Sequence, residues 1–160
     1  MTAESEVHER YRLAYGEALQ ALQQQRESLE ALRTRGGSLI AATAISTSFL
    51  GGLAVDRAGL TYGSWVALAM FTLVILLTLA VILPVWLWRF EISGKEMIAW
   101  VEVDDPPAPG RMWRNLALYH EDSYDRNAPQ LELLQGAFAL AGILLLAEIA
   151  AWVAVIGGRA

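Results

Sequence analysis

Three long apolar stretches, over residues 38–55, 64–88 and 133–158, constrain this chain more than any other feature, because they contain a single charged side chain between them. A helix rises about 1.5 Å per residue, so each stretch can cross the roughly 30 Å hydrocarbon core of a bilayer. Apolar residues make up 55% of the sequence, and their clustering is typical of a membrane protein. Trp65, Trp86 and Trp88 flank the second stretch, where interface aromatics belong. The expected fold is an all-α membrane protein with three transmembrane helices in the lipid bilayer.

The polar segments complete the expected layout. Residues 1–37 are predicted to form a cytoplasmic amphipathic helix, 56–63 a short external loop, 89–132 a cytoplasmic helical segment, and 159–160 the external C-terminus. In the first segment, apolar residues follow steps of three and four, roughly as heptads with a stutter between Ala18 and Leu22. This stripe comprises Val7, Tyr11, Ala14, Ala18, Leu22, Gln25, Leu29 and Leu32.

Within this layout, a second amphipathic helix is expected over residues 111–127. Its apolar side comprises Trp113, Leu116, Ala117 and Tyr124. Gly36-Gly37 indicates a break or a close contact, and residues 127–129 indicate a turn or the cap of the next helix. Because both amphipathic helices carry an apolar stripe and face the same compartment, we expect them to pack together as a helical cap.

The basic residues are distributed unevenly along the chain. Residues 1–37 and 89–132 carry all of its 12 Lys and Arg residues except Arg57 and Arg159. Segments rich in Lys and Arg stay in the cytoplasm, so the N-terminus is predicted to be cytoplasmic and the C-terminus external, in the plasma membrane. Acidic residues count little under this rule. The net charge of -5 argues against nucleic acid as a partner.

Glu148 is the charged residue within the apolar stretches, and no Lys or Arg lies near it in the third crossing. A charge there would cost roughly 2.5–3.5 kcal/mol on insertion scales, so we expect a neutral or strongly hydrogen-bonded carboxyl. The hydroxyls expected at its depth belong to Ser46, Thr47, Ser48 and Thr72. Two interpretations stay open: a structural carboxyl that holds the third crossing on the first, or an ion-sensitive, proton-sensitive or inter-subunit role.

The first crossing carries small residues spaced three and four apart, which allow close helix approach where lipid offers no hydrophobic drive. They are Gly37, Ala41, Ala44, Ser48 and Gly52. Either they pack against the other two crossings of the same chain, or they mediate self-association into a homo-oligomer.

No pattern in the sequence indicates catalysis or metal binding. The chain has no Cys, which excludes thiolate sites, and its histidines, His8 and His120, show no ligand spacing and are expected on solvated polar faces. Phosphate-loop, serine-elbow, HExxH and Rossmann-type glycine motifs are absent from the sequence. We therefore expect no enzyme, no cofactor and no metal.

Two segments, LEALRTRGGSLIAATAISTSFLGG and DSYDRNAPQLELLQGAFALAGILLLAEIAAW, together with the order of the crossings, resemble a group of small bacterial membrane proteins. These are the effectors of nucleotide-signalled defence systems, the Pycsar transmembrane (PycTM) and SLATT-like group. The resemblance covers most of the chain and implies an effector that oligomerises and compromises the inner membrane once a partner detects infection. The chain departs from the group because it shows no appended nucleotide-binding domain, so no ligand-binding residue is carried over.

The sequence leaves three functions open. The first is a non-enzymatic membrane protein that self-associates through its helices, with a membrane-perturbing defence effector as its specific form. The second is a membrane anchor or adaptor that recruits a soluble cytoplasmic protein through its cytoplasmic helices. The third is a small channel or transporter component that uses Glu148. Because three helices alone enclose no wide aqueous path, any pore requires several copies.

Overall fold

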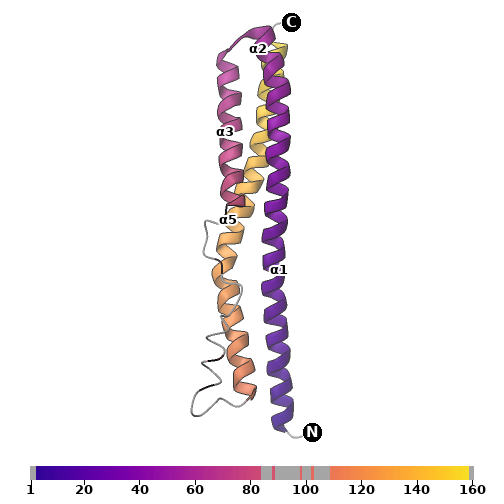
Figure 1. Cartoon of the computed structure of the whole chain (residues 1–160), viewed down its shortest axis with the longest axis vertical. Coiled ribbons are helices and arrows are strands. Elements are labelled where there is room, and N and C mark those ends of the chain that lie inside the picture. Colours follow the sequence, from indigo (N-terminus) through magenta and orange to yellow (C-terminus); the bar gives the residue numbers. More distant parts are fainter. Residues whose placement is uncertain (1–2, 84–87, 89–97, 99–101, 103–108, 159–160) are drawn as a thin grey trace. The chain divides into compact units, whose positions relative to one another are not determined.

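The computed structural model describes residues 3–83, 88, 98, 102 and 109–158, and every regular element among them is a helix (Figure 1). The elements are α1 (Ala3–Ser46), the π-helix η1 (Thr47–Gly51), α2 (Gly52–Ala58), α3 (Tyr62–Ile82) and α5 (Pro109–Gly157). Three helical runs, Glu6–Ala58, Tyr62–Ile82 and Pro109–Gly157, are long and apolar enough to cross a membrane. The expected class, an all-helical protein with three candidate membrane-spanning helices, is therefore confirmed for the described residues.

The chain divides into two compact units. The first unit consists of Met1–Leu29 and Trp86–Leu131, and the second consists of Glu30–Val85 and Glu132–Ala160. α1 and α5 are long enough to contribute one part to each unit.

The second unit packs three helical segments around an apolar interior (Figure 1). One cluster joins Ala54, Ala67 and Trp152, and another joins Val74, Ala141 and Leu145. The pairs Thr47–Glu148 and Gly51–Trp152 advance by four residues on both helices, so the first and third segments run parallel. α3 runs against both, because it follows α2 through a short connection.

The short connection between α2 and α3 reverses the direction of the chain. Gly59 has a φ of 71°, a conformation that glycine adopts without steric cost. α3 then begins with a capping box, in which the Thr61 hydroxyl accepts from the Ser64 N–H and the Ser64 hydroxyl accepts from the Thr61 N–H, both at 3.3 Å. The 21 residues of α3 span about 31 Å, enough for the hydrocarbon core.

In the first unit, α1 and α5 each present a buried row to the unit's interior. The rows comprise Leu22, Gln25 and Leu29 on α1, and Leu116, His120, Ser123 and Asn127 on α5. The Tyr15 ring lies 5.1 Å from that of Trp113, and Gln25 Nε2 donates to the Tyr124 carbonyl at 3.2 Å. Within the described residues of this unit, α1 and α5 therefore pack against each other.

The row on α1 differs from the predicted stripe at two positions, Val7, which is 46% exposed, and Ala14. Ala14 is exposed, and the half-buried Tyr15 takes the position beside the Trp113 and His120 rings. With Tyr15 in the row, positions 11, 15, 18, 22, 25 and 29 follow unbroken steps of four and three, so the predicted stutter is absent. Tyr15 occupies this position because its aromatic ring fills more interior space than the methyl group of Ala14.

Two predicted helix breaks are also absent. α1 continues through Gly36-Gly37, and Gly36 marks a close contact instead, since a Cβ there would lie 3.2 Å from Ile82 Cγ1. α5 continues through Pro129, which contributes no N–H to the helix. Buried positions follow one another in steps of seven across this proline, at Asn127, Leu134 and Ala141, so packing on both sides outweighs the local loss. The predictions for Trp86 and most of residues 89–108 lie outside the described residues.

Candidate functional site

Glu148 is fully buried in the second unit, with 0% of its surface exposed. Its Oε1 atom accepts a hydrogen bond from the Thr47 hydroxyl on η1 and another, at 3.3 Å, from Trp152 Nε1 on its own helix. Its Oε2 atom has no hydrogen-bond partner among the described residues. The carboxyl therefore links the first and third helical segments through one oxygen only.

Two neighbours of Glu148 are positioned by local backbone features. Trp152 follows Glu148 by four residues, so both side chains lie on one helix face. The Trp152 ring packs against Gly51, where a Cβ would lie 3.2 Å from the ring atom Cζ2. Thr47 and Gly51 begin and end η1, and such π-helical turns frequently occur at functional sites. The glycine thus makes room for the indole that donates to the carboxyl.

Both hydrogen bonds to Glu148 reach one of its two carboxyl oxygens. An ionised carboxylate offers about four acceptor positions on two oxygens, whereas both donors here reach the same oxygen. No cation lies against Glu148 among the described residues. The Oε2 atom is therefore the part of the carboxyl that no described donor reaches.

Of the four hydroxyls expected near Glu148, the structure brings Thr47 to it. Thr72 is exposed and donates instead to the Leu68 carbonyl on its own helix at 2.9 Å. Ser48 is exposed and Ser46 half-buried, and neither bonds to Glu148 among the described residues. Sequence reasoning missed Trp152, although its spacing of four from Glu148 was a usable signal.

The small residues of the first crossing form a separate feature, which we call the small-residue face. Its members, Gly37, Ala41, Ala44, Ser48 and Gly52, are all exposed. A Cβ added at Gly37 or Gly52 would meet nothing within 4 Å, whereas the buried Gly36 and Gly51 contact Ile82 and Trp152. The neighbouring glycines thus make the contacts inside the chain, and the small-residue face points away from the other helices of the second unit.

The interface aromatics are described only in part. Trp65 is 61% exposed near the start of α3. Trp88 is half-buried, and Trp86 lies outside the described residues.

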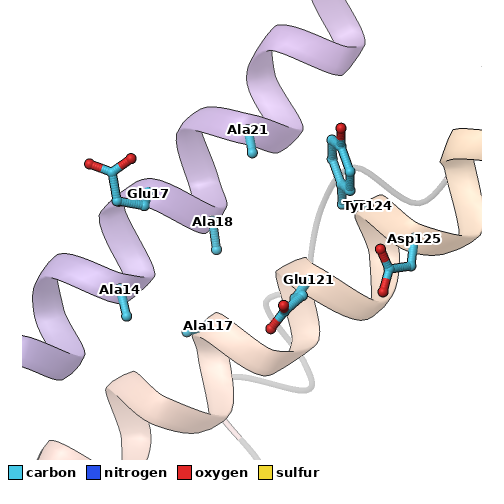
Figure 2. A pocket seen from close by; sticks show the side chains of 8 residues that line it. All are labelled: Ala14, Glu17, Ala18, Ala21, Ala117, Glu121, Tyr124 and Asp125. Carbon is cyan, nitrogen blue, oxygen red and sulfur yellow. The ribbon is translucent and has the colours of Figure 1, made fainter.

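The first unit carries a groove of about 560 Å³ between α1 and α5 (Figure 2). It is lined by Ala14, Glu17, Ala18, Ala21, Ala117, Glu121, Tyr124 and Asp125. No ion pair joins its three carboxylates to another described residue, whereas Asp122 just outside it is bonded to Arg126 at 2.9 Å. The groove therefore combines an alanine lining with uncompensated negative charge.

His120 corrects one sequence expectation, because it is buried rather than on a solvated face. Its side chain is 5% exposed, its ring lies 5.5 Å from that of Tyr15, and its Nδ1 has no hydrogen-bond partner among the described residues. Burial lowers the pKa of His120 below its usual value. Within the described part of the chain, no group of three His, Cys, Asp or Glu residues could hold a metal ion.

A scan against protein-family models and searches of curated proteins and of solved structures find no match to this chain.

Proposed function

We propose that this protein is a non-enzymatic integral membrane protein that self-associates through its small-residue face and acts as a membrane-perturbing effector of a bacterial defence system. The exposure of all five small residues carries the self-association. Lipid chains are as apolar as the helices, so helix association in a bilayer depends on close packing. Residues without bulky side chains permit that close packing, and here no described residue of the same chain packs on Gly37 or Gly52.

The dimensions of the small-residue face support a contact that runs through much of the bilayer. From Gly37 to Gly52 the helix advances fifteen residues, which is about 22 Å of a core of roughly 30 Å. Phe49 and Ile45 are 71% and 70% exposed, and they border a shallow hollow with Ala44 and Ser48. A knob from a neighbouring helix could enter this hollow.

The effector part of the proposal rests on the resemblance to the defence group and on what several copies could do. One copy buries its single intramembrane carboxyl completely, so it offers no polar path to water or ions. Perturbation of the membrane therefore requires assembly. The bias of Lys and Arg supports an inner-membrane location with the N-terminus in the cytoplasm.

Large side chains on the small-residue face test the assembly. We expect Ala44→Leu together with Ser48→Leu to shift the protein in nanodiscs from a multimer to a monomer, measured by single-particle mass. The matched control is Ala80→Leu, which is exposed on α3 and should leave the assembly unchanged. A wild-type protein that is strictly monomeric would contradict the self-association.

Membrane perturbation is tested by dye entry into expressing cells and by growth. The wild type and Ala80→Leu should admit dye once assembled, and the double variant should not. A wild-type protein that assembles but leaves permeability unchanged, even with an inducing partner, would reject the effector role alone.

A second function, a membrane anchor that recruits a soluble protein, is favoured by the groove of the first unit. Its carboxylates have no partner among the described residues, and alanines make up half of its lining (Figure 2).

A further inference from the structure

We propose that the groove of the first unit is the docking surface for a basic amphipathic helix of a protein partner. The inference rests on the anchor function and is independent of self-association through the small-residue face. The groove offers three exposed carboxylates, Glu17, Glu121 and Asp125, around the alanines of α1. A helix with Arg or Lys on its flanks and small apolar residues between them complements both properties.

The spacing of the carboxylates suits a helical occupant. Glu121 and Asp125 are one turn apart on α5, about 6 Å along the axis. Basic residues at i and i+4 on a partner helix repeat at the same distance. Glu17 lies on α1 with its carboxylate turned away from α5 (Figure 2), so it can pair with a basic residue on the outer flank of the docked helix. Arg suits these positions best, because its planar guanidinium binds a carboxylate through two hydrogen bonds.

The alanines of α1 limit the size of the side chains that a docked helix can place in the groove. Ala14, Ala18 and Ala21 are spaced by four and three residues, so they form one strip along α1. Their methyl groups let a second backbone approach closely, provided that its contacting side chains are small or flexible. The neighbouring Asp122 is already bonded to Arg126, so its negative charge is offset just outside the groove.

A second copy of this chain fits the groove less well than a basic partner. Copies related by symmetry in one bilayer hold identical residues at identical depths. The acidic groove of one copy would therefore meet its neighbour at the level of the same carboxylates, and like charges disfavour association. Arg126, the arginine next to Asp125, is bound to Asp122.

The test uses the full chain in nanodiscs of phosphatidylcholine, a lipid without net charge. The probe is a fluorescent alanine-rich helical peptide with Arg at i and i+4, and its control carries Glu at those positions. Empty nanodiscs report binding to lipid. We expect the Arg peptide to bind and the Glu peptide not to bind, and we expect the binding to weaken as salt screens the charges.

Two pairs of variants separate charge from shape. Glu17→Gln, Glu121→Gln and Asp125→Asn together should weaken Arg-peptide binding about tenfold, because three exposed ion pairs are lost at once. The control variant removes the same charge at exposed positions outside the groove and should leave binding unchanged. It carries Glu6→Gln, Glu27→Gln and Glu132→Gln. Ala18→Leu should block binding by filling the groove, whereas Ala31→Leu, exposed elsewhere on α1, should not.

Equal weakening by the two triple variants would overturn the proposal, since the peptide would then sense only overall charge. Normal binding by Ala18→Leu would also overturn it. A change of oligomer size in the groove variants, with peptide binding unaffected, would assign the groove to a second copy. If the Ala44→Leu and Ser48→Leu double variant is monomeric but still binds the peptide, the groove binds its partner without self-association of the chain. Docking and self-association are then separate properties.

Discussion

At the scale of single residues, Glu148 shows how a carboxyl can be held between membrane helices without a charged partner. Thr47 and Trp152 both donate to its Oε1 atom, and each would lose its acceptor if the carboxyl were removed. The depth of Thr47 in the first crossing could be anticipated from the sequence. The choice of Thr47 over Ser46 and Ser48 could not, because the π-helical turn that begins at Thr47 decides it.

The amide variant Glu148→Gln should fold nearly as well as the wild type. Its side-chain oxygen can still accept both hydrogen bonds, and the amide has nearly the same volume as the carboxyl. Glu148→Ala should be destabilised by about 2–4 kcal/mol, because it leaves a cavity and two buried donors without an acceptor. Thermal unfolding in detergent measures both. Equal damage by the two variants would contradict the role of this side-chain oxygen as an acceptor, and lost ion flux in an intact Glu148→Gln assembly would favour the channel function.

His120 should make the first unit sensitive to acid. Because burial lowers its pKa in the folded protein, the unfolded chain binds the proton more readily. The stabilising contribution is therefore complete above the unfolded value of about 6.5 and declines as the pH falls below it. Unfolding of the wild type should become easier between roughly pH 7 and pH 5, and His120→Phe should flatten this dependence. The same pH profile in both proteins would show that other groups are responsible.

At the scale of elements, the sequence predicts where helices form better than where they end. The three crossings follow from clustered apolar residues, which report a local property of the chain. The continuity of α1 through Gly36-Gly37 and of α5 through Pro129 depends on buried positions many residues away. For the same reason, the sequence could not say which of two adjacent glycines faces inward.

Gly36 and Gly37 form a matched pair for testing that difference. Gly36→Leu should destabilise the second unit by about 1–3 kcal/mol, since its side chain would collide with Ile82 and Thr78 on α3. Gly37→Leu should leave folding unchanged because open space surrounds it, but it should weaken self-association. Unfolding in detergent and mass in nanodiscs give the two readouts. If both variants destabilise folding equally, the small-residue face is packed inside the chain.

At the scale of the whole molecule, we expect the three helices that are long and apolar enough to cross a membrane to put the two termini on opposite sides of the bilayer. The absence of Cys from the sequence makes single cysteines clean reporters of this topology. A membrane-impermeant maleimide should label Ala160→Cys in intact cells and should label Ser28→Cys only after the membrane is opened. We expect this labelling because most Lys and Arg residues lie in residues 1–37, which include Ser28, and in residues 89–132, and such segments stay in the cytoplasm. Labelling of Ser28→Cys in intact cells would reverse the topology, and the partner of the acidic groove would then have to come from outside the cytoplasm.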